Sequence, residues 1–397
     1  MKASSEPQRQ RALVVGTAPP TRCGLASYTF NLSRAIEYDG MTADILRLVD
    51  DNDVITGQPF AIRCLWNRSS ASSLRTAATF ANSYDALLLQ HEFGIYPGPD
   101  GCDVSEFLGL LSIPVVSVLH TVLSHPSGLQ RETINTVARI SSSVVVHTST
   151  AQDRLLETYD IDPGKVCVIP HGASSRIGLS QELDRGVPTL LTWGLLGPGK
   201  GIEHGIEAIA ELRHRGLDVE YVVAGATHPN VLRTSGDGYR HDLMALARTL
   251  DVSDLIRFDD HYRSRDEQEQ LLRSSSLVLL PYDSRDQVTS GVLVEALAAG
   301  KPIISTGFPH ARELSDCGGL ALVDHQQPMQ IADAAEAILT TPNLYDSMRR
   351  SSWLEGLRHD WSVVGPRFSR LLDASADDVI GEVVPLRSAT PTRAVVA

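Results

Sequence analysis

Residues 277–306 read LVLLPYDSRDQVTSGVLVEALAAGKPIIST, and this stretch decides the fold of the chain. It begins with an apolar run of strand length and continues as a polar loop, after which Ser290 opens a Leu/Ala-rich helix. Gly300 and Pro302 end that helix and begin a second apolar strand. Because a strand, a helix and another strand follow one another directly, the stretch predicts a parallel sheet with crossover helices.

The same alternation of short apolar runs and helical patterns continues towards both ends. Two successive series of this kind predict an α/β protein with two doubly wound, Rossmann-like domains built on parallel sheets. We expect strands at 11–16, 42–46, 85–90, 114–120, 143–148 and 165–170, then at 189–193, 219–224, 255–258, 277–281, 302–306 and 320–323. We expect helices at 27–37, 149–159, 202–215, 241–250, 266–273, 291–299 and 328–339.

The length of 397 residues fits two domains of ordinary size. The boundary is expected within 172–187, which is rich in Ser, Gly and charged residues. A final helical pattern at 356–374 is expected to return to the first domain. The predicted organisation is a disordered start at 1–10, domains at 11–180 and 181–355, and a flexible tail at 375–397.

The composition restricts the partners. The formal net charge of −13 repels phosphate backbones, so nucleic acid is not an expected partner. The polar N-terminus resembles no signal peptide, and no apolar run approaches the ~20 residues of a membrane span. The five cysteines are odd in number and scattered, which favours reduced thiols and a cytoplasmic protein. The oligomeric state stays open.

The helix after Ser290 is the first candidate binding element. A helix N-terminus at the carboxyl end of a strand offers free backbone N–H groups and a positive dipole, which suit a diphosphate. Glu295 lies about one turn further on, and its carboxylate can accept two hydrogen bonds from a ribose diol. The alternative is that Glu295 only caps or solvates its own helix.

The second candidate element is the loop at 194–201, which reads GLLGPGKG between a strand and a helix. Its Lys200 is a candidate for neutralising a diphosphate, although a solvated lysine in an ordinary turn is the alternative. The loop nearly matches a P-loop, but Gly201 stands where Ser or Thr would hold magnesium. No convincing second acidic motif accompanies it, so a nucleoside triphosphatase is disfavoured.

Further candidates follow strands of the first domain. The loop after the first strand contains Gly24 but does not have the GxGxxG spacing of dinucleotide-binding proteins. His91, Glu92 and His120 fall where strands end, and ligand sites of α/β proteins form at such ends. A structural histidine and a solvated His–Glu pair remain the alternatives.

In this order and spacing, the motifs resemble the GT-B-fold retaining glycosyltransferases of family 4, also called group 1. The usual signature of that family has two glutamates eight positions apart. Glu295 matches the second, which holds the nucleotide ribose, and the first falls on Gln287. The sequence VIPHG at 168–172 resembles the crossover between the family's two domains, with His171 facing the cleft.

The resemblance implies roles for named residues. Catalytic roles fall on His120, Lys200 and Glu295, and acceptor contacts on Gly24, His91, Glu92 and His120. Donor contacts fall on Gly24, Gly199, Lys200, Asp286, Gln287, Thr289, Ser290, Gly291, Val292 and Glu295.

The chain departs from the family pattern at three positions. Leu195 stands where an arginine is expected to face the diphosphate. Lys200 and the helix dipole near Ser290 would then carry more of the charge, and Arg285 or Arg263 is the alternative. Cys23 replaces the first glycine of a Gly-Gly loop. Gln287 replaces a glutamate, which bears on the identity of the donor sugar.

The resemblance implies an enzyme, a hexosyltransferase that moves mannose or glucose with retention. The donor would be GDP-mannose or a UDP-hexose, and the acceptor a carbohydrate or other hydroxyl compound, with no cofactor. No metal is expected, because Asp51-Asn52-Asp53 lies in a polar loop and no cluster has ligand spacing. Two alternatives stay open: a non-catalytic nucleotide-sugar-binding or regulatory GT-B protein, and a nucleotide-sugar epimerase.

Overall fold

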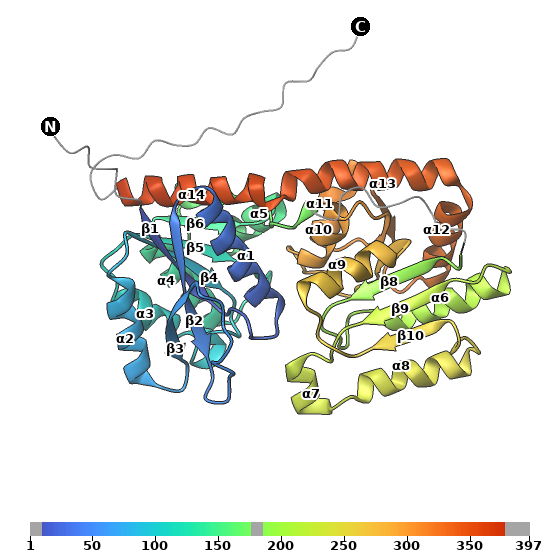
Figure 1. The fold of residues 1–397 in the computed structure, drawn as a ribbon, viewed down its shortest axis with the longest axis horizontal. Coiled ribbons are helices and arrows are strands. Elements are labelled where there is room, and N and C mark those ends of the chain that lie inside the picture. The colour runs from blue at the N-terminus through green and yellow to red at the C-terminus, as the bar shows by residue number, and fades with distance from the viewer. Residues whose placement is uncertain (1–9, 176–185, 378–397) are drawn as a thin grey trace, which may run out of the picture.

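The computed structural model describes residues 10–175 and 186–377 as two parallel sheets, each covered by helices (Figure 1). The expected loose ends lie almost entirely outside the described residues, as do positions 176–185 of the expected boundary. Residues 375–377 are an exception, because the last helix includes them.

The first sheet has seven strands in the order β3-β2-β1-β4-β5-β6-β7. The order reverses between β1 and β4, and ligands of doubly wound sheets bind beyond the carboxyl ends of strands at such a switch point. The strands are β1 (Arg11–Gly16), β2 (Thr42–Val49), β3 (Ile62–Asn67), β4 (Ala86–His91), β5 (Val115–Leu119), β6 (Ser143–Val146) and β7 (Val166–Val168). The helices are α1 (Gly24–Tyr38), α2 (Ala71–Ala81), α3 (Val104–Gly109), α4 (Gly128–Ile140) and α5 (Ser149–Thr158).

The second sheet has six strands in the order β10-β9-β8-β11-β12-β13, and its switch point lies between β8 and β11. The strands are β8 (Thr189–Trp193), β9 (Glu220–Ala224), β10 (Ile256–Asp259), β11 (Leu277–Leu280), β12 (Ile303–Thr306) and β13 (Leu320–Val323). The helices are α6 (Ile202–His214), α7 (Pro229–Ser235), α8 (Gly238–Thr249), α9 (Arg265–Ser274), α10 (Gly291–Ala298), α11 (Pro309–Leu314) and α12 (Pro328–Thr340).

The predicted fold class is confirmed: both sheets are parallel throughout. All twelve predicted strands are present, and the apolar runs of the central strands are buried on both faces. We did not predict β3, an edge strand that is only partly buried and contains Arg63 and Asn67. An edge strand needs no continuous apolar run, since one side lacks a neighbouring strand.

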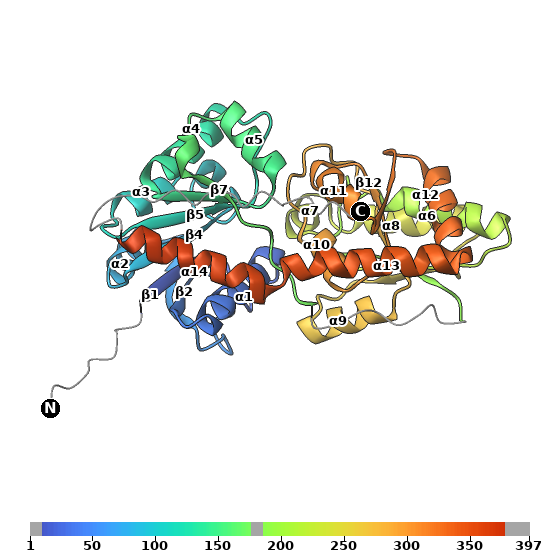
Figure 2. The same cartoon turned by 90° about the horizontal axis from the view of Figure 1, so that it is seen from above.

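Two long helices cross both domains along one side of the molecule (Figures 1 and 2). We predicted one helix at 356–374, and the structure has α13 (Pro342–Gly356) followed after a short turn by α14 (Trp361–Asp377). α13 packs on α10 of the second domain and α14 on α1 of the first. Glycines allow both approaches: a Cβ on Gly356 would lie 2.4 Å from Ala298 Cα, and one on Gly365 would lie 2.8 Å from Ala35 Cβ.

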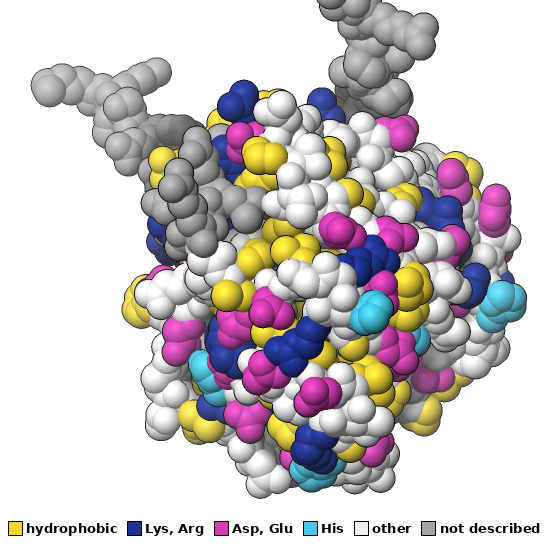
Figure 3. Space-filling model, turned by 90° about the vertical axis from the view of Figure 1, so that its right-hand side faces the viewer, with side chains coloured by type: hydrophobic (Ala, Val, Ile, Leu, Met, Phe, Trp, Pro, Cys, Tyr) yellow, Lys and Arg dark blue, Asp and Glu magenta, His cyan; other side chains and the backbone are white. Residues whose placement is uncertain are grey.

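Acidic and basic side chains lie intermixed on the end of the molecule that Figure 3 shows. In the second domain, side chains of opposite charge form ion pairs. Arg215 of α6 pairs with Glu211 on its own helix and with Glu336 on α12, each at 2.7 Å. None of the helices within the described ranges has both the length and the apolar character to cross a membrane.

Candidate active site at the junction of the two sheets

The candidate donor residues gather at the switch point of the second sheet. The loop after β8 contains Lys200, and the loop after β11 leads into α10 at Gly291. Neighbouring parallel strands end at the same edge of a sheet, so β8 and β11 bring these two loops together. A direct contact confirms this, because the Asp283 amide donates to the Gly199 carbonyl at 3.0 Å.

The start of α10 presents free backbone amides. The Ser290 side chain caps the helix by accepting from the Leu293 amide at 3.3 Å, and the Ser290 amide donates to Nδ1 of His310 at 2.9 Å. Burial lowers the pKa of His310 to about 3, so its ring stays neutral and can accept this bond. The next two amides, of Gly291 and Val292, have no acceptor within the described residues. These two N–H groups are available to an anion.

Lys200 lies on the neighbouring loop, and that loop reaches the helix start, because a Cβ on Gly194 would lie 3.8 Å from Val292 Cγ2. The Lys200 Nζ is 4.2 Å from the centroid of the Tyr282 ring, and it forms no ion pair with a carboxylate in the described part of the chain. Burial lowers the pKa of the Lys200 ammonium, since the charged form loses hydration. A bound anion would supply the missing counter-charge.

A close approach between backbone atoms fixes the conformation of the loop that contains Lys200. Gly201 has a φ of 63°, and a Cβ on it would lie 1.9 Å from the Pro281 carbonyl oxygen. A Ser or Thr at position 201 would clash with Pro281 unless the loop after β11 moved. The structure therefore explains in physical terms why the chain departs from a P-loop here.

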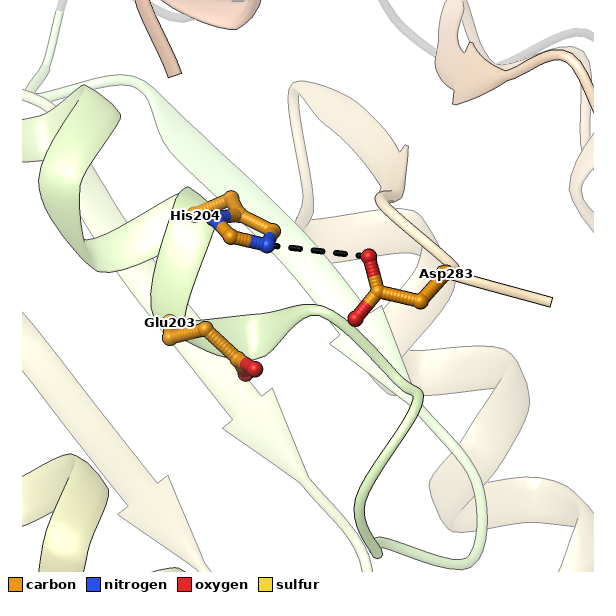
Figure 4. A group of neighbouring side chains, drawn as sticks. All are labelled: Glu203, His204 and Asp283. Atoms are coloured by element: carbon orange, nitrogen blue, oxygen red, sulfur yellow. Dashed lines mark ion pairs between the residues drawn. The ribbon is translucent and has the colours of Figure 1, made fainter. Parts of the chain in front are cut away.

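Three polar side chains, Glu203, His204 and Asp283, lie next to this loop (Figure 4). His204 Nε2 lies 3.6 Å from Asp283 Oδ1, while His204 Nδ1 lies 3.3 Å from Glu207. Glu203 accepts a hydrogen bond from the Tyr239 hydroxyl at 2.7 Å. Possible ligand atoms of Glu203, His204 and Asp283 lie within 4.8 Å of one another, and Asp283 Oδ1 makes no hydrogen bond within the described residues.

Glu295 lies on α10 with its carboxylate already engaged. It accepts a hydrogen bond from Gln268 Nε2 of α9 at 2.5 Å. Burial raises the pKa of Glu295 to about 7, against the lowering effects of hydrogen bonds from Gln268 and Trp193 and of the Arg265 charge. The carboxylate is thus partly protonated at neutral pH and sensitive to any further donor.

The residues expected to hold the hexose are partly engaged with protein partners. Asp286 Oδ1 accepts from the Ser124 hydroxyl at 3.0 Å, and Arg154 donates to the Asp286 carbonyl at 2.7 Å. Gln287 Nε2 donates to the carbonyl of Thr289 at 3.1 Å. Each side chain keeps one oxygen for a ligand, because Asp286 bonds through Oδ1 and Gln287 through Nε2, and the Asp286 side chain is 65% exposed.

No second cation stands in for the arginine that Leu195 replaces. Arg263 pairs with Asp259, and its side chain is only 10% exposed. Arg285 lies exposed on the loop after β11. Within the described residues, the candidate anion site therefore consists of Lys200 and the amides of α10.

In the first domain, Gly24 is the first residue of α1, and a Cβ on it would meet nothing within 4 Å. Cys23 caps this helix, since its Sγ accepts from the Ala26 amide at 3.3 Å. Tyr262 of the second domain approaches the same loop, with its hydroxyl 3.5 Å from the Cys23 carbonyl oxygen. The loop after β1 thus lies at the contact between the domains.

His120 follows β5 and belongs to a group of buried rings. Its Nε2 lies 2.8 Å from Gln90 Oε1, and the Tyr28 ring centroid is 4.7 Å away. His147 and His171 also surround Tyr28, at 5.4 and 4.7 Å. Burial, followed by the neighbouring histidines, lowers the pKa of His120 well below its usual value. A neutral ring that donates to Gln90 leaves Nδ1 as an acceptor.

His91 was expected in a loop at the acceptor side, and the structure places it inside β4, fully buried. Both of its ring nitrogens lack a hydrogen-bond partner, and burial lowers its pKa to about 4. Glu92, next in sequence, accepts from the Thr121 hydroxyl at 2.5 Å. The His91 ring lies in the core, so it meets an acceptor only if the structure rearranges.

Sequence reasoning did not single out Gln90, Tyr28, Gln268, Arg154 or His147. His147 follows β6 as His120 follows β5, so the strand-end rule that found one would also have found the other. Gln268 lies mid-helix and gave no signal, because its role comes from a contact 27 positions away.

Other features lie apart from this junction. Asp51 accepts from Asn67 at 2.8 Å, and Asp53 lies 3.9 Å from the buried Arg47, so the Asp51–Asp53 segment has structural partners. A surface hollow of about 510 Å³ lies near α4, but the Lys165 ammonium on its wall is held by backbone carbonyls such as that of Ser141 at 2.9 Å.

Curated proteins with similar sequences are glycosyltransferases by name. Alpha-D-kanosaminyltransferase of Streptomyces kanamyceticus is 25% identical over 61% of this chain and 66% of its own length. D-inositol 3-phosphate glycosyltransferase of Corynebacterium glutamicum (strain R) is 28% identical over 59% of this chain and 58% of its own. The chain thus matches less than two thirds of the length of either relative.

Solved structures share the fold. Sucrose-phosphate synthase from Thermosynechococcus elongatus superposes with a TM-score of 0.72 at 15% identity, over 91% of this chain and 98% of that one. The Anabaena protein HepE in complex with UDP and glucose gives 0.72 at 15% identity, over 91% and 99%. At this identity the likeness shows the GT-B fold alone.

Two family descriptions match successive parts of the chain. "Glycosyltransferase Family 4" matches residues 23–175, and "Glycosyl transferases group 1" matches residues 187–341. Each match covers most of one domain, and their order is that of the two sheets. The chain therefore belongs to the family 4, or group 1, glycosyltransferases of the GT-B fold.

Proposed function

We propose that this protein transfers a hexose, with retention of configuration and without a metal ion, from a nucleotide sugar to a hydroxyl acceptor. Two observations at one switch point carry the proposal. The Lys200 ammonium has no carboxylate partner among the described residues, and the neighbouring helix start has free amides at Gly291 and Val292. One ammonium, two N–H groups and a helix dipole form an anion site of the size of a diphosphate.

In this proposal, the nucleoside lies on the second domain. The Glu295 carboxylate accepts hydrogen bonds from the ribose hydroxyls, one turn from the diphosphate. The hexose then points towards the first domain, where Gly24, Glu92 and His120 receive the acceptor. Asp286, Gln287 and Thr289 contact the hexose.

The reaction needs little chemistry from the protein. The bond from the sugar's anomeric carbon to the diphosphate oxygen breaks, and a bond from that carbon to the acceptor oxygen forms on the same face. The acceptor proton passes to the departing diphosphate, so no carboxylate nucleophile is required. Lys200 and the α10 amides lower the barrier by stabilising the charge that develops on the leaving group.

His120 contributes as a neutral acceptor. With Nε2 donating to Gln90, its Nδ1 can take a hydrogen bond from a hydroxyl of the sugar or the acceptor. Because its pKa is lowered by burial, this role does not depend on pH near neutrality.

The donor is proposed to be a UDP-hexose or GDP-mannose, and the transferred sugar glucose or mannose. A UDP-hexose is the first to test, because the structurally similar HepE is described in complex with UDP and glucose. One relative is named for the sugar kanosamine and the other for D-inositol 3-phosphate, so only a hydroxyl compound is proposed as the acceptor here. All five cysteines are unpaired, which supports a location in the cytoplasm.

The test is transfer or hydrolysis of radiolabelled UDP-glucose and GDP-mannose, with and without a chelator. The proposal predicts turnover that the chelator does not change. Lys200→Ala and Glu295→Ala should each lose at least about 100-fold in activity, while Arg248→Ala and Glu132→Ala, on exposed positions, should keep it. Wild-type turnover in both site variants would contradict the site.

A second candidate is a binding or regulatory protein of the same fold without turnover. The partly engaged side chains of Asp286 and Gln287, and Leu195 in place of an arginine, favour it. Nucleotide-sugar binding without transfer or hydrolysis, with any acceptor, would support it. An epimerised sugar, formed from the donor alone, would instead identify an epimerase.

A further inference from the structure

Helix α9 supplies a hydrogen bond to the carboxylate of α10. Gln268 Nε2 lies 2.5 Å from Glu295 Oε2, and both side chains are only partly accessible. An ionised carboxylate only accepts hydrogen bonds, so the amide must present its nitrogen rather than its oxygen. The bond therefore both fixes the orientation of the carboxylate and favours its charged form.

A ribose diol has two hydroxyls that can donate to such a carboxylate. The carboxylate accepts both when it is charged and one oxygen of it remains unoccupied. Gln268 occupies one lone pair of Oε2 and Trp193 donates a further hydrogen bond to the carboxylate, so a ligand can use the remaining lone pairs. The geometry suits a vicinal diol and does not require Glu295 to turn on binding.

We propose that Gln268 is a positioning residue for nucleotide recognition, holding the Glu295 carboxylate oriented and charged for the ribose diol. This inference rests on the proposed function, since it deepens the role of Glu295. It adds a residue on a helix that no sequence motif pointed to.

Hydrogen bonds near its N-terminus fix the position of α9. Ser264 and Glu267 form a capping box at its start. Arg265 donates to Asn31 of α1 at 3.2 Å, which ties α9 to the first domain. A contact between the domains is therefore connected through one helix to the group that would hold ribose.

The charged and titratable groups that act on Glu295 are few. Burial dominates, and Gln268, Trp193 and the Arg265 guanidinium oppose it. Tyr262 also senses the Glu295 charge, although its own pKa is raised, so it stays neutral. Because Gln268 favours the charged form, removing its amide should move the titration of Glu295 to higher pH.

The experiment measures nucleotide-sugar affinity by calorimetry between pH 6 and pH 9. UDP-glucose and GDP-mannose are the probes, because the diphosphate of a nucleotide sugar carries no proton that titrates near neutral pH. Wild-type affinity should fall as pH decreases through about 7, where Glu295 gains a proton. For Gln268→Leu, affinity should be about tenfold lower at pH 7, and its decline should begin at higher pH.

The matched control is Gln270→Leu, an exposed position on the same helix, which should bind as the wild type does. A 2′-deoxyribose analogue of each probe loses one hydroxyl donor. Its affinity should be lower for the wild type and should change less on Gln268→Leu. This difference between ribose and deoxyribose separates a positioning role from a general loss of stability.

The outcomes are distinguishable. If wild-type protein binds no nucleotide sugar, the proposed function fails. If it binds, and Glu295→Gln weakens binding while Gln268→Leu keeps the wild-type affinity at every pH, the proposed function stands and this inference is overturned. Equal losses for the ribose and deoxyribose probes would overturn it as well.

Discussion

Glu295 shows which features of a site residue can be predicted from the sequence and which cannot. Its position after Ser290 was enough to predict a carboxylate on α10, one turn from the helix start. Its partners were not predictable, because Gln268 approaches from another helix. The same holds for Asp286, which the sequence placed at a donor sugar and the structure places against Ser124 of the other domain. Long-range hydrogen bonds leave no local pattern in a sequence.

His91 illustrates a different error at the same scale. The strand was predicted to end at residue 90, and β4 extends to His91. Gln90 and His91 are both fully buried, so both faces of the sheet are covered at this end of β4. The ring therefore lies in the core, against Phe93 at 5.2 Å.

Glu295→Gln should change stability in a pH-dependent way. Burial raises the folded-state pKa of Glu295 to about 7 from an ordinary 4.5, so the folded protein binds this proton more tightly than the unfolded chain. The stabilising effect of the proton is complete below pH 4.5 and is lost as pH rises through 7. At pH 8 the free energy of unfolding of the variant should therefore exceed that of the wild type by on the order of 2 kcal/mol. At pH 4.5 the two proteins should differ little in stability. Urea unfolding at both values measures this, and an equal difference at both would contradict it.

At the scale of elements, the apolar runs were the reliable signal. β8 and β13 have the predicted bounds, since buried parallel strands read as continuous Leu, Val and Ile. β3 and α13 were missed because β3 is an exposed edge and α13 mixes polar residues with few apolar ones. The switch points, where the site loops lie, followed from strand order and not from any local pattern.

Gly201→Ser tests the loop between β8 and α6. The variant has the full P-loop sequence, but its Cβ would meet the Pro281 carbonyl, and serine at a φ of 63° is strained. We expect a loss of about 2 kcal/mol or more in unfolding free energy and no nucleoside triphosphatase activity. Thermal unfolding and phosphate release measure the two effects. Gly199→Ser, at a φ of 86° but with nothing within 4 Å of an added Cβ, is the control that separates backbone strain from the clash.

A variant as stable as the wild type would show that the backbone relaxes at Gly201. In that event, the absence of Ser or Thr at this position would need an explanation other than space.

At the scale of the molecule, the loop after β11 links the two domains. Arg154 of α5 donates to the Asp286 carbonyl, and Thr148 donates to the Val288 carbonyl at 3.0 Å. Glu313 of α11 accepts from the Ser149 and Thr150 amides at the start of α5, at 2.8 and 3.0 Å. The proposed donor loop is thus ordered partly by the opposite domain.

Arg154→Ala should loosen this loop without unfolding either domain. Its guanidinium also donates to the Val122 carbonyl at 3.1 Å, so the substitution removes bonds on both sides of the junction. Amide hydrogen exchange should accelerate in a peptide covering 284–290 and stay unchanged in one covering β1. Arg139→Ala, on the exposed side of α4, is the control. Unchanged exchange at 284–290 would show that the second domain orders the loop alone.

The account depends on where the diphosphate binds, and a crystal structure with UDP-glucose or GDP-mannose measures this directly. We predict diphosphate oxygens within hydrogen-bonding distance of Lys200 Nζ and the amides of Gly291 and Val292, with the ribose hydroxyls on Glu295 and Gln268 still bonded to it. A nucleotide sugar bound with its diphosphate elsewhere, or Lys200 and the α10 amides left without a ligand at saturating concentration, would contradict the account.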